Sequence, residues 1–314
     1  MAATPLSEKQ YDSALSGVDF SAGAAFANGE YIPVSEAKIS ILDFGFTRSD
    51  VTYDVVHVWK GRFFRLEDHL TRFENSCRSL RLSLPHTRDE LREILTNCVR
   101  LSALQDAYVD MICTRGFPRP GSRDIRYCTN QFVAYAVPYI WIFTPEQQQR
   151  GGHLLISKVP RISPESVDPT VKNFHWGDLT RGLFQALDAG ADTAVLVDMD
   201  GYVSEGPGFN AFCVKDGEVL SPGDTVLEGV TRASVRELCE EMGIPFSLAK
   251  VTPDQFRQAD EIFLSSTAGG IMPIRRVDDR ILSNDAPGEL TLRIRDRYWE
   301  KHEEGWHGTD VDYR

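Results

Sequence analysis

The sequence lacks the features of proteins that bind nucleic acids or cross membranes. Its 46 acidic residues outnumber 34 basic ones, giving a net charge of −12, and Lys and Arg form no clustered block. Because binding to a phosphate backbone depends on clustered cations, we expect no nucleic-acid partner. The longest strongly apolar run, residues 136–143, contains Pro138 and is far shorter than the roughly 20 residues that span a bilayer. No transmembrane helix is therefore expected.

Cysteine is scarce and scattered. The chain has six cysteines, and no two of them are spaced as C-x-x-C. This distribution is untypical of a zinc site or a redox pair, so we expect no metal. The opening stretch, MAATPLSEKQYDSALSG, contains neither the basic nor the apolar segment of a secretory signal. We therefore expect a cytoplasmic protein with reduced thiols.

Several common catalytic motifs are also absent. The sequence contains no G-x-G-x-x-G after a predicted strand, no G-x-x-x-x-G-K-[ST], no H-E-x-x-H and no G-x-S-x-G. Dinucleotide-binding, P-loop, zinc-protease and hydrolase functions thus have no sequence support. A composition of 42% hydrophobic and 25% charged residues is typical of a globular chain, and 314 residues suffice for one large or two ordinary domains.

Local patterns predict an α+β fold. Short turns at Asn28-Gly29 and Lys60-Gly61 separate β-rich runs and predict antiparallel hairpins. Apolar residues spaced by three or four from Leu66 to Leu80 predict a helix, and Thr87 predicts the capped start of a second one. Further long helices are expected over residues 178–188, 231–242 and 289–302.

Two α/β subdomains are expected, joined by a polar segment. Residues 144–152, TPEQQQRGG, show no apolar periodicity and are predicted to form the linker. Residues 1–143 would form a small N-terminal domain, and residues 153–314 a larger C-terminal one. Within the first domain, residues 115–130 are rich in Gly, Pro and Arg and predict a long surface loop.

Lys172 is the candidate nucleophile or base. It lies between Val171 and Asn173, close to Phe174 and Trp176, just before a predicted helix. Apolar and aromatic surroundings disfavour a charged amine, so they lower its pKa and suit it to Schiff-base formation. An isolated lysine is more often a solvated surface residue. The assignment therefore depends on the segments that accompany it.

Glu205 and two hydroxyl-rich turns complement this lysine. Glu205 ends a predicted strand and is followed by Gly-Pro-Gly, which leaves room for a ring beside a carboxylate that can bind a protonated pyridine nitrogen. Turns at a helix start and in a glycine-rich loop offer N–H groups and hydroxyls suited to phosphate, although each alone is equally a plain cap or loop. The candidate phosphate ligands are Val230, Thr231, Ser266, Thr267 and, as a cation beside the apolar stripe of an early helix, Arg72.

These residues lie in blocks that resemble the class IV, or fold type IV, aminotransferases. The blocks run in order through most of the chain, as SDVTYDVVHVWKGRFFRLEDHLTR, VKNFHWGDLTRGLF, SEGPGFN, LEGVTRASV and SSTAGGIMPI. Within the family, DPTVKNFHWGDL and PYIWIF look most like the (R)-selective amine transaminases. The resemblance implies pyridoxal 5′-phosphate as cofactor, bound between the two domains, and a homodimer with its active site at the subunit interface.

The resemblance also implies roles for individual residues. Lys172 would bond to the cofactor and shuttle a proton, and Glu205 would keep the pyridine nitrogen protonated. Cofactor-binding positions that match are Arg72, Phe209, Asn210, Val230, Thr231, Ser266 and Thr267. Positions that match substrate residues are Tyr53, Val55, Tyr108 and Trp176. Arg48 stands where many (R)-amine transaminases have a histidine and Tyr108 where a phenylalanine is expected, and this added cation and hydroxyl would favour carboxylates. Among Arg119, Arg123 and Arg126 of the long loop, Arg123 or Arg119 is the favoured mobile cation for a keto acid.

Differences from relatives narrow the choice of substrate. Branched-chain aminotransferases place an arginine in the strand that here contains Tyr108-Val-Asp110, so this chain lacks their means of holding a carboxylate. We therefore predict transfer of an amino group from an (R)-amine to a keto acid such as pyruvate, by a ping-pong mechanism. The nearest alternative is a D-amino acid aminotransferase. Less favoured are a branched-chain aminotransferase, an aminodeoxychorismate lyase and a non-catalytic protein on the same scaffold.

Overall fold

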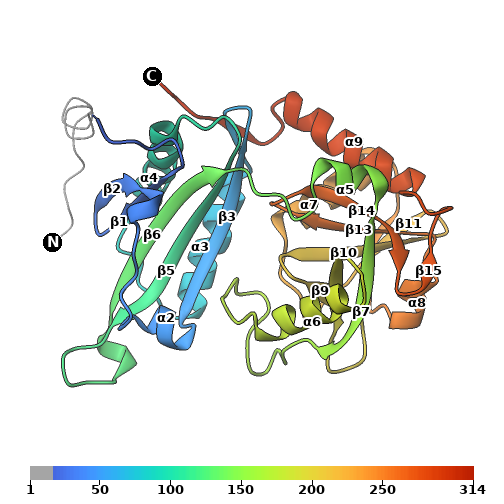
Figure 1. Cartoon of the computed structure of the whole chain (residues 1–314), viewed down its shortest axis with the longest axis horizontal. Coiled ribbons are helices and arrows are strands. Elements are labelled where there is room, and N and C mark those ends of the chain that lie inside the picture. Colours follow the sequence, from blue (N-terminus) through green and yellow to red (C-terminus); the bar gives the residue numbers. More distant parts are fainter. Residues whose placement is uncertain (1–16) are drawn as a thin grey trace. The chain divides into compact units, whose positions relative to one another are not determined.

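The computed structural model describes residues 17–314, which form two compact units. In the described part, the first unit holds residues 17–140 and 307–314, and the second holds residues 141–306. Of the opening stretch considered above as a signal, only Gly17 belongs to the described residues. Each unit combines a sheet with helices (Figure 1), which confirms the α+β class.

The sheet of the first unit has seven strands in the order β16-β4-β3-β5-β6-β1-β2. Its described strands pair antiparallel throughout. The predicted hairpins are confirmed, because Asn28-Gly29 joins β1 to β2 and Lys60-Gly61 joins β3 to β4, with positive φ at all four residues. The strands are β1 (Ala24–Ala27), β2 (Glu30–Pro33), β3 (Val51–Trp59), β4 (Arg62–Phe64), β5 (Ala107–Phe117), β6 (Thr129–Pro138) and β16 (Gly308–Asp310).

Two long helices pack on one face of this sheet. Their apolar stripes, with Leu70 and Phe73 on α3 and Leu95 on α4, are buried in one core with strand residues such as Val56. Thr87 and Glu90 form the expected capping box at the start of α4. The helices of this unit are η1 (Val34–Glu36), α2 (Phe44–Arg48), α3 (Leu66–Ser79), α4 (Arg88–Ser102) and η2 (Ile125–Tyr127).

The second unit is built on a nine-stranded mixed sheet. Its main path is β12-β11-β10-β13-β14-β7-β8, with β9 paired to β10 and β15 to β14. The pairs β7/β8, β7/β14 and β11/β12 are parallel. The strands are β7 (Gly152–Pro160), β8 (Thr193–Val197), β9 (Glu205–Gly206), β10 (Phe209–Lys215), β11 (Glu218–Ser221), β12 (Phe246–Leu248), β13 (Glu261–Ser266), β14 (Gly270–Val277) and β15 (Arg280–Ile281).

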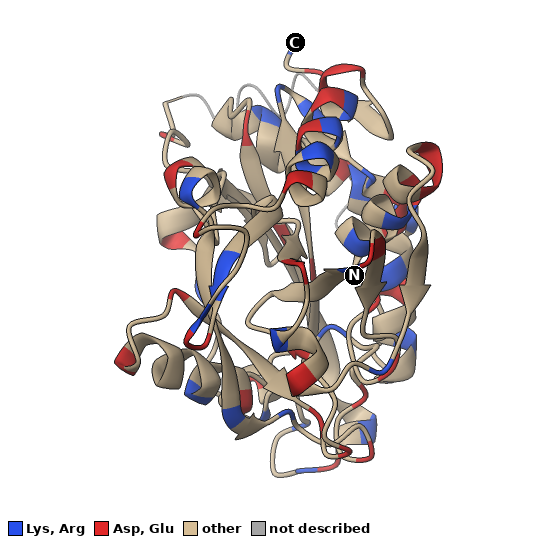
Figure 2. Cartoon of the chain, turned by 90° about the vertical axis from the view of Figure 1, so that its right-hand side faces the viewer, with Lys and Arg blue, Asp and Glu red and all other residues tan. Residues whose placement is uncertain are grey.

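Helices of the second unit pack against this sheet, α6 on β7 and β8, and α7 and α9 on β13. Acidic and basic residues are interspersed along the helices (Figure 2), as in α9, where Arg297 pairs with Glu241 and Glu304. Within residues 17–314, no helix has the length and apolar character needed to cross a membrane. The helices are α5 (Pro145–Arg150), α6 (Gly177–Asp188), α7 (Val230–Glu241), α8 (Pro253–Arg257) and α9 (Glu289–Glu303).

The domain limits expected from the sequence differ from those observed. Residues 144–152 are not an irregular linker but contain α5, which starts with a capping box of Thr144 and Gln147, and Gln148 of this helix is buried. A six-residue helix is too short to display an apolar period, which explains the missing signal. The division falls instead between Ile140 and Trp141. Residues 307–314 return to the first unit, because β16 pairs with β4.

Candidate active site

Glu205 begins β9 and is buried, with 7% of the residue exposed. Its Oε1 accepts hydrogen bonds from Nε and Nη2 of Arg161, at 3.3 and 3.1 Å, and its Oε2 accepts one from the backbone N–H of Leu227 at 3.0 Å. Burial raises the pKa of Glu205, and the charges of Arg161 and Lys172 oppose that rise. These three hydrogen bonds from Arg161 and Leu227 hold the carboxyl group of Glu205 in one position.

Arg161 is a site residue that the sequence reasoning missed. It follows β7, is buried, and donates from Nη1 to Oδ2 of Asp178 in the first turn of α6, at 2.6 Å. The same Asp178 oxygen accepts the backbone N–H of Ile162 at 2.7 Å. A charged residue directly after an apolar strand was the available signal, since a buried arginine requires acidic partners.

Lys172 lies in the loop between β7 and α6 and is half-buried. Asn173 holds the adjacent turn, because its Nδ2 donates to the carbonyl of Val171 at 2.8 Å and its Oδ1 accepts the N–H of His175 at 2.9 Å. The charge of Lys172 lowers the pKa of Glu205, so the two side chains lie within electrostatic reach of each other. That both residues act on one cofactor stays a prediction.

The two glycines after Glu205 differ in the space beside them, and only Gly206 departs from the expected open position. A Cβ on Gly206 would lie 2.2 Å from the ring of Phe209 and 2.3 Å from the carbonyl oxygen of Ala194. The space beside Gly206 is therefore filled by protein and is not left for a ligand ring. Gly208, with φ of 84°, is more open, and a Cβ there would lie 3.6 Å from the ring of Trp176. Trp176 thus lies along this turn.

The start of α7 is suited to an anion. Its N-cap, Gly229, has no side chain to bind the first N–H groups, and a Cβ there would lie 1.9 Å from Oδ1 of Asn210. Asn210 donates from Nδ2 to the carbonyl of Leu227, the residue whose N–H binds the buried acid. Val230 and the buried Thr231 form the first turn of this helix, where backbone N–H groups favour a phosphate.

The end of β13 and the loop after it add hydroxyl groups to the same region. Ser266 donates from Oγ to the carbonyl of Gly208 at 2.8 Å and accepts the N–H of Ala268 at 3.2 Å, so its hydroxyl shapes the loop, and half-buried Thr267 lies between. Ser265, which the sequence reasoning did not single out, pairs with a residue of β10, and its buried Oγ has no hydrogen-bond partner within the described chain. A buried hydroxyl with spare bonding capacity fits a site for a polar ligand.

Arg72 lies on α3 in the first unit and is held by a buried acid. Its Nε and Nη2 donate to Oδ2 and Oδ1 of Asp54, at 2.7 and 2.8 Å, and Nδ1 of His69 lies 2.8 Å from the same Oδ1. Burial by itself would raise the pKa of Asp54, but Arg72 and His69 hold it well below its usual range. The ion pair fixes the orientation of the guanidinium group. Its binding to phosphate stays a prediction.

Asp54 and His69 were not found from the sequence. Asp54 is an acid within the otherwise largely apolar strand β3. Its side chain lies on the same face of that strand as the core residues Val56 and Val58. A carboxylate on the helix-covered face of a strand requires a cationic partner, because unpaired burial of a charge is costly. That position was the signal that predicts an ion pair here.

The other face of this sheet carries three of the predicted substrate residues. Because the even-numbered residues of β3 face α3 and α4, Tyr53 and Val55 point to the opposite side. Asp110 of β5 lies directly opposite Val55, and Tyr108, two residues away, shares its orientation. Tyr135 of β6 lies opposite Asp110 and donates its hydroxyl to Oδ2 at 3.0 Å. We call this set, Tyr53, Val55, Tyr108, Asp110 and Tyr135, the tyrosine face.

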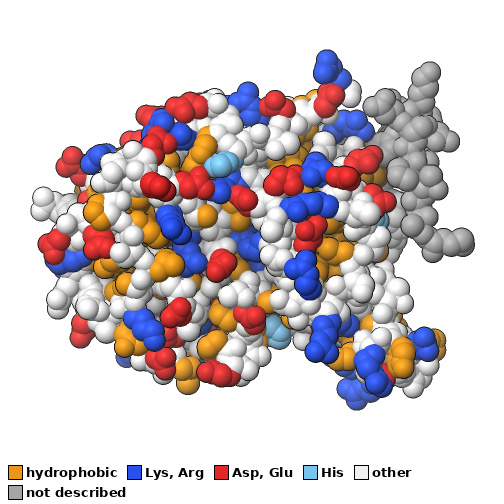
Figure 3. Space-filling model, turned by 180° about the vertical axis from the view of Figure 1, so that it is seen from behind, with side chains coloured by type: hydrophobic (Ala, Val, Ile, Leu, Met, Phe, Trp, Pro, Cys, Tyr) orange, Lys and Arg blue, Asp and Glu red, His pale blue; other side chains and the backbone are white. Residues whose placement is uncertain are grey.

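The long loop between β5 and β6 projects at the lower left of Figure 1 and the lower right of Figure 3, where blue and orange side chains meet. Arg119 lies over the ring of Tyr127, 4.6 Å from its centroid, and Arg126 forms an ion pair with Asp124 at 2.6 Å. Arg123 is exposed. Among the described residues, Arg123 shows neither the ring stacking of Arg119 nor the ion pair of Arg126.

Arg48, the remaining predicted substrate residue of the first unit, ends α2. Its guanidinium carbon lies 3.5 Å from the centroid of the Phe44 ring on the same helix. The stacking accounts for how an exposed arginine is oriented at this helix end. A role toward substrate stays a prediction for Arg48, as it does for Trp176 in the second unit.

Comparison with known proteins identifies relatives over nearly the whole chain. The family model "Amino-transferase class IV" matches residues 52–277. A putative branched-chain-amino-acid aminotransferase of Methanocaldococcus jannaschii is 30% identical over 276 residues, 87% of this chain and 94% of that protein. D-alanine aminotransferase of Bacillus licheniformis is 29% identical over 272 residues, 85% and 93% of the two chains. The branched-chain amino acid aminotransferase of Thermobaculum terrenum, solved in its PLP form, has a TM-score of 0.83 and 25% identity, covering 94% of this chain and 100% of that one.

A lysine near a buried acid, with an uncapped helix start beside them, fits the chemistry of pyridoxal phosphate. The chain belongs to the class IV aminotransferases, has fold type IV and uses pyridoxal phosphate to transfer amino groups.

Proposed function

We propose that this aminotransferase moves an amino group from an (R)-amine to a keto acid such as pyruvate, by a ping-pong mechanism. The observation that carries the proposal is the composition of the tyrosine face. Its five members offer phenols, an alkyl group and an acid, and include no Arg or Lys to hold the carboxylate of an amino acid donor. Such a surface suits a donor amine without a carboxylate, because an unpaired carboxylate would be desolvated against an acid.

Pyridoxal phosphate, when bound, supplies an aldehyde that takes up the donor's amino group and a ring that accepts electrons. We expect the amine of Lys172 to bind at that aldehyde and to move the proton at the donor's Cα. We expect Glu205 to bind the proton at the ring nitrogen. Arg161 supports this role, because its charge favours the carboxylate form of Glu205 against the effect of burial.

The phosphate is expected at the start of α7. Val230 and Thr231 would bind it through the first turn of that helix, and Thr267 and Arg72 would complete the set with a hydroxyl and a cation. Phe209, Asn210 and Ser266 would support the site, since each packs or bonds to the turns around Gly208 and Leu227.

The keto acid requires a cation in the second half-reaction. Arg123 or Arg119 of the long loop are our candidates, because an exposed loop arginine can reach a carboxylate bidentately and withdraw when an apolar donor binds. Replacing each in turn by Gln should raise the KM for pyruvate and leave the KM for the amine unchanged.

A donor and acceptor panel tests the proposal. Purified enzyme should convert (R)-1-phenylethylamine with pyruvate faster than it converts D-alanine or D-glutamate with 2-oxoglutarate, and faster than L-leucine. The similarity to a D-alanine aminotransferase makes D-amino acids the second candidate donors. A clear preference for D-alanine would replace the (R)-amine assignment by that second candidate. Release of pyruvate without an amino acceptor would indicate a lyase.

We further propose a cytoplasmic homodimer. Exposed apolar side chains of the first unit at Ile41, Leu42 and Phe46, exposed by 74%, 69% and 63%, support an interface with a second copy. All six cysteines are free thiols, which is in keeping with a reducing compartment. Light scattering should give twice the chain mass of 35.3 kDa. A mass of one chain at micromolar concentration would contradict the dimer.

A further inference from the structure

We propose that Asp110 makes this enzyme favour amino donors that carry a second, remote cationic group, and that it disfavours donors carrying a remote carboxylate. The proposal rests on the proposed function, because it takes the tyrosine face as part of the donor site. It concerns the far end of the donor and not the chemistry at Lys172.

Asp110 occupies the middle of the tyrosine face. In the ladder it lies directly opposite Val55 on β3 and Tyr135 on β6, and only 4% of the residue is exposed. Tyr108 precedes it by two residues, so the two side chains leave the strand on the same side. Ile112 follows it by two residues on the same face, and His57 lies opposite Tyr108, so the carboxyl group has alkyl groups, phenols and one imidazole around it.

The hydroxyl groups nearest to Asp110 belong to tyrosines, and one of them binds its carboxyl group. The hydroxyl of Tyr135 donates to Oδ2 of Asp110 at 3.0 Å, and a hydrogen bond of this kind favours a carboxylate over a carboxylic acid. Burial, and after it the charge of Asp110, raises the pKa of Tyr108 and of Tyr135. Both phenols therefore stay neutral at neutral pH. The face therefore presents one buried acid beside neutral phenols.

A buried carboxylate discriminates ligands by charge. In a partly buried site, its attraction for a cation and its repulsion of an anion are several times stronger than in bulk water. An ammonium group offers N–H donors that match the acceptor oxygens of Asp110. The rings of Tyr108 and Tyr135 add attraction between a cation and an aromatic face. We therefore expect donors to rank by their remote group as cationic, then neutral, then anionic.

The test uses (R)-amines that differ only at the remote end. Dimethylammonium and isopropyl groups have the same tetrahedral branched shape and differ mainly in charge, and a carboxylate end of similar size adds the anionic member of the series. Each donor is assayed with pyruvate at several chain lengths. At the best length, kcat/KM should be at least about tenfold higher for the dimethylammonium donor than for the carboxylate donor, with the isopropyl donor between them.

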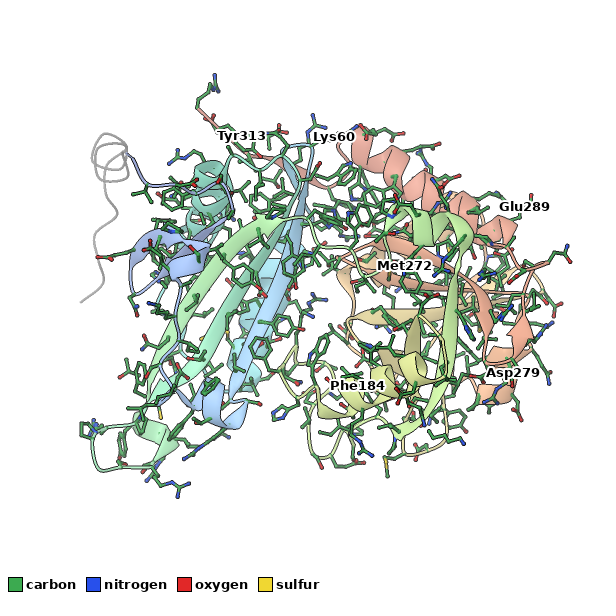
Figure 4. The ribbon with its side chains drawn as sticks, in the orientation of Figure 1. Lys60, Phe184, Met272, Asp279, Glu289 and Tyr313 are labelled. Carbon is green, nitrogen blue, oxygen red and sulfur yellow. The ribbon has the colours of Figure 1, made fainter. Side chains whose placement is uncertain are left out.

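Asp110→Asn keeps the size of the side chain and removes its charge. This variant should lower the ratio of dimethylammonium to isopropyl turnover by about tenfold. Tyr135→Phe removes the hydrogen bond that favours the carboxylate form of Asp110 but keeps the acid, so it should reduce the preference by less than Asp110→Asn does. Asp279→Asn is the matched control, since Asp279 is exposed in the turn between β14 and β15 (Figure 4) and its loss changes the net charge equally. Its ratio should equal that of the wild type.

The outcomes separate the two proposals, and the wild-type series needs no variant to fold. Turnover of all three donors at equal rates, or a preference for the carboxylate donor, would overturn the role of Asp110 and leave the (R)-amine function standing. A ratio unchanged in Asp110→Asn would overturn it as well. Turnover of D-alanine with none of the (R)-amines, (R)-1-phenylethylamine included, would overturn both.

Discussion

Arg161 donates two hydrogen bonds to one carboxylate oxygen of Glu205, and its third guanidinium nitrogen binds Asp178. Asp178 also accepts the N–H of Ile162, so the two ends of the segment 161–178 are tied together. Lys172 lies within that segment. One buried arginine therefore holds the acid of the site and closes the base of the loop that carries the lysine.

Arg161→Gln should shift the pH dependence of catalysis. Loss of the guanidinium charge removes the main influence that opposes the effect of burial, so the pKa of Glu205 rises further. A larger fraction of Glu205 is then protonated at a given pH, and the acidic limb of the kcat profile moves to higher pH, with kcat near neutrality falling about tenfold. Arg62→Gln, which breaks an exposed pair with Asp310, should leave the profile in place. An unmoved acidic limb in Arg161→Gln would remove this role.

Lys172→Ala should abolish transamination while the chain still folds. We expect kcat to fall by at least ~10²–10⁴, because the amine is needed for proton transfer at Cα. The Tm should change little, since a half-buried loop lysine contributes little packing. Lys158→Ala, at an exposed position on β7, is the control and should retain full turnover. Normal turnover by the Lys172 variant would exclude it as the base.

Asp54→Asn should destabilise the first unit and weaken cofactor binding. Breaking a buried ion pair from one side costs about 3–5 kcal/mol, whereas Asp310→Asn, in the exposed pair with Arg62, should cost under about 1 kcal/mol. Because the pKa of Asp54 is lowered by folding, its contribution is complete above the ordinary pKa of Asp, about 4, and is lost as the pH falls below it. Urea unfolding of both variants and the wild type at several pH values measures the loss of unfolding free energy and its dependence on pH. If the Asp54→Asn variant stayed less stable than the wild type by the same amount in acid, the stabilising role of the Asp54 charge would be contradicted.

Gly229→Ala should disturb the start of α7. The added methyl group would overlap Oδ1 of Asn210, and overpacking of this kind costs about 1–3 kcal/mol. Titration with pyridoxal phosphate, followed by the absorption of the bound cofactor, should show weaker binding. Gly177→Ala, at the first residue of α6, adds the same group where no atom lies within 4 Å and should bind normally. If both variants bound pyridoxal phosphate with equal affinity, the start of α7 would not be part of the cofactor site.

Local patterns predicted much of the fold. The hairpin at Asn28-Gly29 and the capped start of α4 at Thr87 were predicted because both depend on residues close together in the chain. The helix α5 and the return of the C-terminus as β16 were missed. A short polar helix leaves no period, and an edge strand such as β16 is defined by its partner β4.

Residue types at fixed spacing were enough to indicate the family, the order of most elements and the candidates Lys172 and Glu205. The pairing of the buried charges emerged from the three-dimensional arrangement alone: Arg161 with Glu205 and Asp178, Arg72 with Asp54, and Tyr135 with Asp110. These contacts join residues distant in sequence. They arise because a buried charge must find a partner wherever the fold brings one within reach, and spacing along the chain carries no record of that distance.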